Sequence, residues 1–319
     1  MSTNTKIKVV GVGGSGSNTI SGMKKSGLQG VEMIIINTDI QDINKVRADV
    51  KIRIGKKTTQ GLGAGMDPEI GKQSAIENRQ EIIDALKATS LVFITYGAGG
   101  GTGTGAGPII AEIAKEIGAL TIAVVTKPFS FEGQVRNKIA ENGIKELKDK
   151  VDALIVISND KLLSILDPKT SVLNAFSICD DILYQAVSGI SDLITLPGII
   201  NVDFADIKTI MASSGSALFG VGKAVGENRI EKAVSAAINS PLLDISIKGA
   251  KGVLFNVSGE DLSLNEINQA AKIITKEINP EAKIIFGAVQ NEKLAPYRTR
   301  SGAGLKKGEI KITVIATGF

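Results

Sequence analysis

The chain has 319 residues, 43% apolar and 22% charged, which is typical of a soluble globular protein long enough for two domains. It contains no histidine and one cysteine, Cys179, so zinc sites built from His and Cys and nucleophile pairs that need an imidazole are excluded. The formal charge is only +4 and 4% of residues are aromatic, which offers little for nucleic-acid binding. The sequence has no signal-peptide pattern and no apolar run of the roughly 18 residues that a membrane helix needs. We therefore expect a cytoplasmic protein with no nucleic-acid partner and no membrane insertion.

A first glycine loop follows the first predicted strand. The apolar run Lys6 to Val10 leads into Gly11-Val-Gly-Gly-Ser-Gly16, which matches the G-x-G-x-x-G pattern of phosphate-binding turns. A second predicted strand, Val31 to Ile36, ends just before Asn37. Asp39 lies 23 residues beyond Gly16, close to where dinucleotide-binding folds place an acid for the ribose. Taken alone, this region favours an NAD-dependent Rossmann oxidoreductase.

A second glycine-rich stretch, Gly61 to Gly65, precedes Asp67 and Pro68. Aspartate is a good helix N-cap and proline is favoured in the first helical turn, so we expect a helix from about Glu69 to Leu86. The glycine stretch is interpreted as a lid over a terminal phosphate. The alternative is an ordinary surface loop.

The third and strongest glycine stretch runs from Gly97 to Gly107, between a predicted strand, Leu91 to Tyr96, and a helical pattern, Ile109 to Ile117. Glycines let the backbone approach a ligand, and the amides and dipole of a helix N-terminus favour an anion, so the stretch predicts bound phosphate. It is not a Walker loop, because no Gly-Lys-Ser/Thr follows. A flexible linker is disfavoured between a buried strand and a helix. Two phosphate loops on one sheet favour several phosphates, and a Rossmann oxidoreductase needs no second loop.

The order Gly100-Gly-Thr-Gly-Thr-Gly105 resembles the signature of the tubulin and bacterial FtsZ superfamily. The first loop has that family's spacing and ends in an asparagine, Asn18, although Ser15 and Ser17 stand where the family often has glycine. The Gly61 to Gly65 pattern is similar as well. The resemblance implies an α/β fold: a Rossmann-like GTP-binding domain on a parallel sheet, a long central helix and a smaller α+β C-terminal domain.

Two charged residues, Glu132 and Arg136, follow the predicted strand Leu120 to Val125. In a helix they would share one face, and the simplest interpretation is a surface ion pair worth about 0.3 kcal/mol. In the family, the similar Phe-Glu-Gly-x-x-Arg segment contacts the sugar and phosphates of the nucleotide, and the resemblance implies those roles here. Asn159 follows another predicted strand, Ala153 to Ile157, at the end where open α/β sheets bind ligands.

Apolar residues recurring every three or four positions from Val172 to Ile194 predict a helix of more than twenty residues, which we interpret as the central helix. Phe176 and Asp180 share one of its faces. A ring that stacks on a purine beside a carboxylate that accepts the guanine N1 and N2 hydrogens would select guanine over adenine. The resemblance implies this role for Phe176 and for Asp180 or Asp181, and helical spacing favours Asp180. The alternative for Phe176 is a core position.

The segment 200–208 after this helix carries Asn201, Asp203 and Asp206 between apolar residues. From the residues alone, Asp203 is best interpreted as a helix N-cap. However, Asn-x-Asp-Phe-Ala-Asp resembles the family's synergy loop, which implies that the acids are presented to the nucleotide of the next subunit. There they would polarise the attacking water and help to bind a cation.

The C-terminal region is predicted to be α+β. Its predicted strands are Ile207 to Met211, Gly252 to Val257, Lys283 to Val289 and Glu309 to Ala316, and its predicted helices are Glu227 to Asn239 and Ser263 to Ile278. The basic connection Gln290 to Gly308 is interpreted as a solvated loop, or else as an extra contact for a filament neighbour, nucleic acid or membrane. The chain ends at Phe319 without the tail by which many family members reach membrane tethers, so a trimmed or a reduced protein is expected.

These observations predict a GTP-binding domain at residues 1–170, a connecting helix at 171–196 and the synergy loop with the C-terminal domain at 197–319. The predicted function is a GTPase that assembles head to tail into filaments, forming the cell-division ring, with GTP or GDP and Mg²⁺ bound. The alternatives are the NAD-dependent oxidoreductase and a GTP-gated filament with little turnover. The predicted catalytic residues are Asn201, Asp203 and Asp206. The predicted nucleotide-binding residues are Gly13, Gly14, Ser15, Gly16, Ser17, Asn18, Asn37, Gly65, Gly97, Ala98, Gly99, Gly100, Gly101, Thr102, Gly103, Thr126, Pro128, Glu132, Arg136, Asn159, Phe176 and Asp180.

Overall fold

The computed structural model describes residues 5–28, 30–163, 166–167, 169–196, 198–240, 243, 246–290 and 308–319. It divides into two compact units, Met1–Val187 and Ser188–Phe319. The division falls inside α8 (Val172–Thr195), so the predicted helix of more than twenty residues is confirmed. The predicted domain boundaries at 170 and 196 bracket this helix and stay a prediction.

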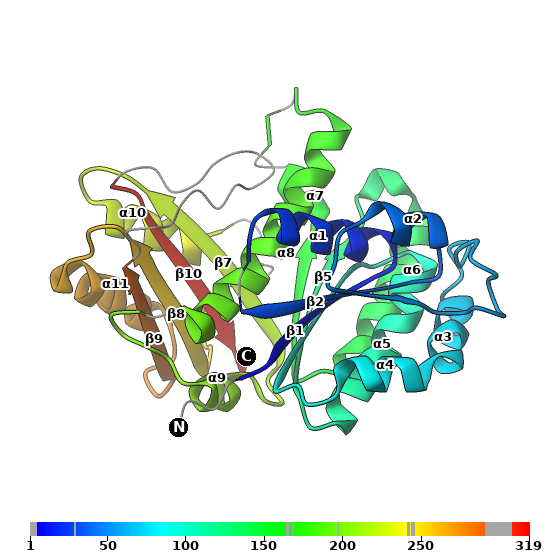
Figure 1. Ribbon diagram of the computed structural model, residues 1–319. Helices are drawn as coiled ribbons and strands as arrows, with labels where there is room; N and C mark the ends of the chain where they lie inside the picture. The colour runs from blue at the N-terminus through cyan, green and yellow to red at the C-terminus, as the bar shows by residue number, and fades with distance from the viewer. Residues whose placement is uncertain are drawn as a thin grey trace. The chain divides into compact units, whose positions relative to one another are not determined.

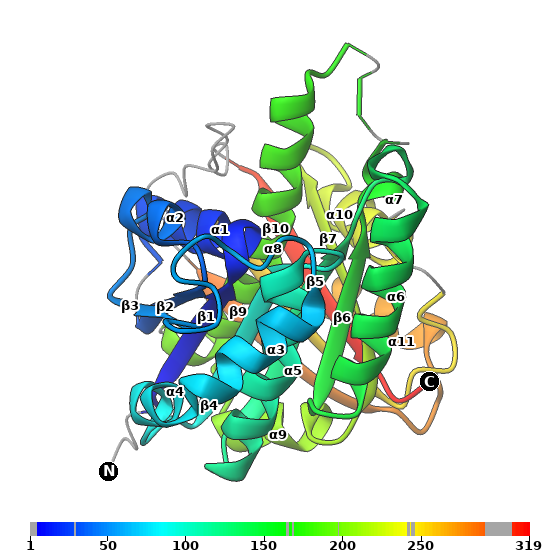
Figure 2. The same ribbon diagram turned by 90° about the vertical axis from the view of Figure 1, so that its right-hand side faces the viewer.

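The first unit is built on parallel strands in the order β3-β2-β1-β4-β5-β6. Their bounds are β1 Ile7–Val12, β2 Val31–Asn37, β3 Val50–Arg53, β4 Leu91–Gly97, β5 Leu120–Lys127 and β6 Ala153–Ser158. Most of these strands are near-continuous apolar runs because helices cover the sheet. Figure 2 shows α3, α5 and α6 side by side along it. The crossover order is that of a doubly wound sheet, which brings ligands to the carboxyl ends of the strands.

Both glycine loops at the carboxyl edge are more helical than the sequence indicates. Helix α1 (Gly13–Lys25) begins directly after β1, and α5 (Gly101–Glu116) begins eight residues before Ile109, where the apolar pattern predicted it to start. The extra turns consist of small residues because α5 packs closely against α3 (Pro68–Glu77): a Cβ on Gly105 would lie 1.9 Å from the Pro68 carbonyl oxygen. Here glycine is required by backbone packing as well as by any ligand.

The predicted helix from Glu69 to Leu86 is in fact two helices, α3 and α4 (Arg79–Leu86). The chain breaks at Asn78, whose Oδ1 accepts a hydrogen bond from the Gly55 backbone N–H at 2.9 Å. The predicted cap is confirmed, since the Asp67 side chain accepts from the Glu69 N–H at 2.9 Å. Periodicity missed the break because a tertiary contact of the Asn78 side chain decides it.

The remaining helical elements of the first unit are short or lie at the rim of the sheet. They are α2 Ile40–Lys45, η1 Ser130–Glu132, α6 Gln134–Lys148 and α7 Asn159–Leu163. Helix α2 and strand β3 were not predicted, because neither is long enough to show a clear apolar period.

The second unit contains a mixed sheet in the order β7-β10-β8-β9, in which β10 is antiparallel to both neighbours and β8 is parallel to β9. The strands are β7 Gly215–Ala224, β8 Gly252–Gly259, β9 Lys283–Gln290 and β10 Ile310–Thr317. Helices α10 (Arg229–Ile238) and α11 (Leu264–Glu277) pack together on this sheet around an apolar core (Figure 1). The α+β prediction for this region is confirmed.

One element of the second unit was predicted wrongly. Ile207 to Met211 is not a strand but the last part of α9 (Phe204–Met211), which buries Ile207, Ile210 and Met211 at helical spacing. Strand β7 was missed because its glycines mask the strand pattern: a Cβ on Gly222 would lie 1.9 Å from the Ala233 carbonyl oxygen of α10. Most of the basic connection 290–308, residues 291–307, lies outside the described residues. Within the described ranges, no helix is long and apolar enough to cross a membrane.

Candidate functional site

Two adjoining cavities open at the carboxyl edge of the parallel sheet. Their volumes are about 360 Å³ and about 250 Å³, and both are lined by Gly14, Ser15, Gly97 and Arg136. The sheet topology explains the place, since β1, β4, β5 and β6 all end here and each continues into a lining segment. Together the cavities form one elongated site that suits a ligand with distinct ends.

Phe176 lies at the wall of the larger cavity and is 40% exposed. The interpretation of Phe176 as a core residue is therefore wrong. Its ring meets the buried Phe129 edge to face at a centroid distance of 5.4 Å, and Phe129 stacks on Phe131 at 4.9 Å. The Phe176 ring is thus supported by Phe129 and still accessible, as a platform for a flat ligand requires.

Asp180 lines the same cavity, one helical turn beyond Phe176 on α8, whereas Asp181 is not among the lining residues. One carboxylate oxygen of Asp180, Oδ1, accepts a hydrogen bond of 2.9 Å from the hydroxyl of Thr19 on α1. Next to it, burial raises the pKa of the Cys179 thiol to about 12, with the Asp180 charge adding to the effect. Cys179 is therefore a neutral wall residue and not a nucleophile.

The predicted ion pair between Glu132 and Arg136 forms, with 3.0 Å between Oε2 and Nη1. The two residues do not share one helix, because Glu132 ends η1 and Arg136 belongs to α6, with Gly133 between them at φ 102°. The other Glu132 oxygen accepts from the Phe129 backbone N–H at 2.8 Å. Glu132 therefore ties the Phe129 segment to the cavity wall.

Three polar atoms in this region are buried without a hydrogen-bond partner among the described residues: Arg136 Nε, Asn159 Oδ1 and Asn37 Nδ2. Their residues line one or other cavity. Most buried polar atoms in proteins are paired, so unsatisfied donors and acceptors of this kind indicate a polar ligand. A molecule with both hydrogen-bond acceptors and donors would satisfy them.

The smaller cavity is formed by the N-termini of α1 and α5. Neither helix has a side-chain cap, since their N-cap residues are Val12 and Gly100, so the first-turn amides have no capping partner. Uncapped amides and two converging helix dipoles favour an anion such as phosphate. The hydroxyls of Thr38 and Thr102 also line this cavity and lie 2.6 Å apart.

Most of the predicted nucleotide-binding residues line the two cavities. The exceptions are Gly16, Ser17, Gly65 and Gly99. Gly16 serves packing, because a Cβ there would lie 2.5 Å from the Thr95 carbonyl oxygen of β4. The Gly99 N–H is already used, since it donates to Thr104 Oγ1 at 3.0 Å.

Several further residues line the cavities. Val12, Gly63 and Ala64 belong to the predicted glycine loops and Asp39 was considered as a ribose ligand, whereas the sequence did not predict Thr38, Asp42, Met66, Cys179 and Leu183. The position of Thr38 directly after β2 could have identified it, because Asn37 at the end of the same strand was already assigned to the site. Asp39 caps α2 by accepting from the N–H groups of Gln41 (2.8 Å) and Asp42 (3.3 Å), which weakens its interpretation as a ribose ligand.

A protein-only metal cage is not found: the described ranges hold no group of three or more His, Cys, Asp or Glu side chains that could bind a metal ion. Asp39 and Asp42 are the acids that line the smaller cavity. This donor set fits a Mg²⁺ ion that takes most of its ligands from phosphate and water.

The three predicted catalytic residues belong to the second unit and are exposed. Asn201 Oδ1 accepts from the Gly198 N–H at 2.7 Å, which shapes the loop. Asp203 occupies the N-cap position of α9, as predicted, but its side chain makes no capping hydrogen bond in the described structure. Asp206 lies in the first turn of α9.

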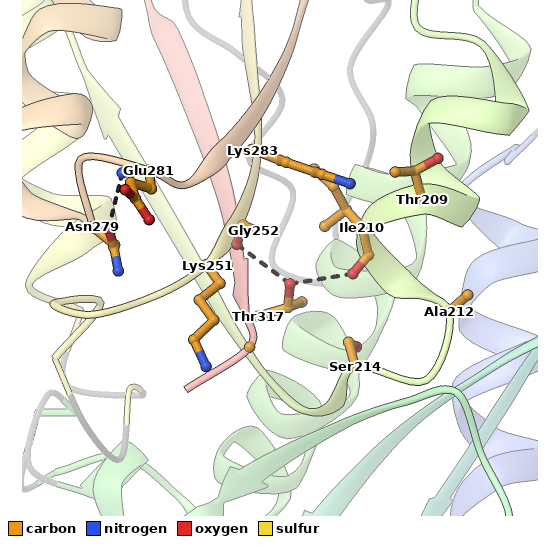
Figure 3. Close-up of a pocket in the computed structure, with 11 residues that line it drawn as sticks. Thr209, Ile210, Ala212, Ser214, Lys251, Gly252, Asn279, Glu281, Lys283 and Thr317 are labelled. Carbon is orange, nitrogen blue, oxygen red and sulfur yellow. Dashed lines mark hydrogen bonds between the residues drawn. The ribbon is translucent and has the colours of Figure 1, made fainter.

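The second unit has a cavity of its own, about 420 Å³, between the end of α9 and the starts of β8 and β9 (Figure 3). Its central polar group is the Thr317 hydroxyl, whose single proton can be donated to the carbonyl oxygen of Ile210 (3.2 Å) or of Gly252 (3.4 Å). It contains no glycine-rich helix start. Although larger, it lacks the anion-binding features of the site in the first unit.

Comparison with known proteins agrees with this geometry. The family model for the GTPase domain of the tubulin/FtsZ family matches residues 6–167, and that for the C-terminal domain of the FtsZ family matches residues 215–319. The chain belongs to the tubulin/FtsZ family. The FtsZ of M. jannaschii, solved as an empty dimer, is 46% identical with a TM-score of 0.91, covering 98% of this chain and 88% of that one.

Two more distant structures share the fold. CetZ2 from Haloferax volcanii, solved as a protofilament with GTPγS, is 20% identical with a TM-score of 0.77, covering 98% of this chain and 92% of that one. CetZ1 from the same organism, a GDP-bound monomer, is also 20% identical, with a TM-score of 0.81 and coverages of 98% and 94%. The two cavities lie in the part of the chain that matches the GTPase domain and in the adjoining α8.

Proposed function

We propose that this FtsZ-family protein binds GTP across the two adjoining cavities and hydrolyses it to GDP and phosphate in a site completed by a second copy of the chain. The observation that carries the proposal is the convergence of two uncapped helix N-termini, those of α1 and α5, on one cavity. Such an arrangement can hold several phosphates from two sides. Because residues 6–167 match the GTPase domain of the tubulin/FtsZ family, we infer that the nucleotide is GTP.

In this proposal the phosphates occupy the smaller cavity and the nucleoside the larger one. Phe176 stacks on the base, and the Asp180 carboxylate accepts the guanine N1 and N2 hydrogens. Glu132, Arg136 and Asn159 contact the ribose and the adjoining phosphate. The buried unpaired atoms Arg136 Nε and Asn159 Oδ1 support this assignment, because the nucleotide would supply their missing partners.

Hydrolysis needs a group that orients and deprotonates water, whereas Asp39 and Asp42, the acids of the phosphate cavity itself, suit a Mg²⁺ ion. We assign the catalytic role to Asp203 and Asp206 of the next copy, with Asn201 shaping the loop. The exposed carboxylate of Asp203, which makes no capping hydrogen bond, supports this. Mg²⁺ bound to the phosphates would neutralise charge that develops during transfer. The carboxylates would polarise the attacking water.

A site shared in this way implies a head-to-tail contact, and a head-to-tail contact that does not close produces an open filament. The structures of relatives as a dimer and as a protofilament support self-association. We propose that the filament acts in the cytoplasm in a cell-division ring, with division proteins as membrane tethers.

The first alternative, an NAD-dependent oxidoreductase, is disfavoured by the family match and by the capping role of Asp39. The second, a GTP-gated filament with little turnover, predicts nucleotide binding and assembly without phosphate release.

The deciding experiment measures phosphate release from GTP with Mg²⁺ over a range of protein concentrations, together with sedimentation. We expect a specific rate that rises steeply above a threshold concentration at which polymer sediments. A specific rate independent of concentration would overturn the shared site, and polymer without phosphate release would favour the second alternative.

A further inference from the structure

The hydroxyl of Thr19 contacts the carboxylate at the base end of the larger cavity. Thr19 lies on α1, is 1% exposed, and donates to Asp180 Oδ1 on α8 at 2.9 Å. The same oxygen lies 3.1 Å from the Ser15 carbonyl, one turn back on α1. A hydroxyl has a single proton, so these two acceptors compete for it. The carboxylate is both nearer and charged, and hydrogen bonds to charged acceptors are the stronger ones.

We propose that Thr19 is a positioning residue for base selection: its hydroxyl fixes the orientation of the Asp180 carboxylate so that this group accepts two hydrogens from one edge of guanine. The inference rests on the proposed GTP site. The terminal torsion of a carboxylate has only a weak intrinsic preference, so the hydrogen bonds that the group accepts set its orientation. A hydrogen bond from the buried Thr19 hydroxyl on α1 contributes to this orientation before the base arrives.

The bond leaves the carboxylate able to bind the base. An ionised carboxylate offers about four acceptor positions on its two oxygens, so the contact at Oδ1 does not block acceptance of the guanine N1 and N2 hydrogens. Two parallel hydrogen bonds demand that the plane of the carboxylate coincide with that of the base, whereas a single bond tolerates rotation. Loss of the Thr19 hydroxyl should therefore weaken the two-bond contact more than a one-bond contact.

The test uses three nucleoside diphosphates, which bind without being hydrolysed. GDP offers the N1 and N2 hydrogens. IDP lacks the N2 amino group and offers the N1 hydrogen alone, and ADP has a hydrogen-bond acceptor at N1 where guanine has a donor. Thr19→Val removes the hydroxyl and keeps the shape of the side chain, while Thr19→Ser keeps the hydroxyl. In the full chain below its assembly concentration, we expect Thr19→Val to weaken GDP binding about 10-fold and IDP binding no more than about 3-fold. Thr19→Ser should keep the wild-type ratio of GDP to IDP affinity.

A merely structural role for Thr19 would lower the affinities for GDP and IDP by the same factor, and an unchanged ratio in Thr19→Val would overturn the proposal. In an Asp180→Ala background, Thr19→Val should change GDP affinity less than about 2-fold; a full loss there would equally overturn it. If thermal unfolding shows that Thr19→Val is misfolded, Thr19→Ala takes its place in both measurements. Failure of the wild-type protein to prefer GDP over ADP would refute the proposed function itself, which separates the two conclusions.

Discussion

The hydroxyls of Thr38 and Thr102 lie 2.6 Å apart in the smaller cavity, and they join the end of β2 to the first turn of α5. Thr38 is fully buried and Thr102 is 8% exposed. One hydroxyl of the pair donates to the other, which leaves a single hydroxyl proton to be offered to a ligand. The pair thus presents a donor beside the uncapped amides of α5, at the place where we propose the phosphates bind.

Loss of the Thr102 hydroxyl should weaken nucleotide binding. We expect Thr102→Val to lower GTP affinity about 10-fold, the usual effect of removing a hydrogen bond to a charged group, and Thr102→Ser to remain close to wild type. A bulky residue such as tryptophan at this position should abolish binding, because a Cβ on Gly13 would already lie 3.3 Å from the Thr102 Cβ. Equilibrium binding of a fluorescent GTP analogue measures these effects. Unchanged affinity in both Thr102→Val and Thr102→Trp would remove the α5 N-terminus from the site.

The acidic loop should act on turnover and not on binding. Asp206→Ala and Asp203→Asn should keep GTP affinity within about twofold and lower phosphate release by at least about 100-fold, the usual contribution of a positioned acid or base. The control is Glu281→Gln, another exposed acid of the second unit, which lines the cavity at the C-terminal end of α9. Because the loop is proposed to serve the neighbouring copy, a mixture of Asp206→Ala with a nucleotide-binding mutant should recover some turnover. Wild-type turnover in Asp206→Ala would remove that residue from the mechanism.

The base specificity should depend on the chemistry of residue 180. Asp180→Asn replaces one acceptor oxygen by an N–H donor, which matches xanthine, whose C2 position carries an oxygen in place of the guanine amino group. We expect the ratio of GTP to XTP affinity to fall by more than about tenfold, since sites built on hydrogen bonds discriminate strongly against a mismatched edge. Asp181→Asn is the matched control. A larger fall of the GTP to XTP affinity ratio in Asp181→Asn than in Asp180→Asn would indicate that Asp181 contacts guanine.

The short helix η1 after β5 is attached through Asp160 to α7, which follows β6. The Asp160 carboxylate accepts from the Ser130 backbone N–H at 2.9 Å and from the Ser130 hydroxyl, and Ser130 begins the short helix that ends in Glu132. We expect Asp160→Ala to raise the KM for GTP about 3- to 10-fold with little change in kcat, because the Glu132 contact would lose its support. Asp160→Asn retains an acceptor for the N–H and should have a smaller effect. An unchanged KM in Asp160→Ala would mean that the segment is held by its aromatic contacts.

Stability should depend on pH through Asp192 in the second unit. Burial raises its pKa from 3.8 to about 6, and the nearby Lys311 partly opposes the shift. The folded state therefore binds this proton more tightly than the unfolded state. The free energy of unfolding contributed by this group is highest below about pH 4, falls between about pH 4 and 6, and stays low above that range. Asp192→Asn should remove this fall, because the amide does not titrate. Urea unfolding of both proteins at about pH 5 and pH 7 measures the free energy of unfolding. If Asp192→Asn changed this free energy equally at both pH values, the argument would be contradicted.

Much of the site was predictable because it consists of local signals. A glycine run between a buried strand and a helix, or Phe176 and Asp180 one turn apart on a long apolar helix, is a relationship between neighbours in the chain. Such relationships depend on backbone preference and helical period, which the sequence expresses directly. The absence of histidine likewise restricts the chemistry to carboxylates, amides and hydroxyls, because composition does not depend on how the chain folds.

The errors of prediction have a common cause, which is packing between distant segments. Strand β7 was missed because its glycines pack closely against α10: a Cβ on Gly222 would lie 1.9 Å from the Ala233 carbonyl oxygen. Asn78 divides a helix because its side chain bonds to Gly55. In each case a tertiary contact outweighs the local pattern, and a local pattern carries no information about which distant residue will be the neighbour.

The class of fold, the glycine-rich stretches at the site and the residues proposed to bind the base all follow from the amino-acid sequence. How those residues are held follows from the tertiary structure. Thr19 and Asp180 are 161 residues apart, and no spacing rule connects them. Their hydrogen bond exists because α1 and α8 meet at the same edge of the parallel sheet, and the order of strands in that sheet is set by the burial of apolar surface over the whole unit.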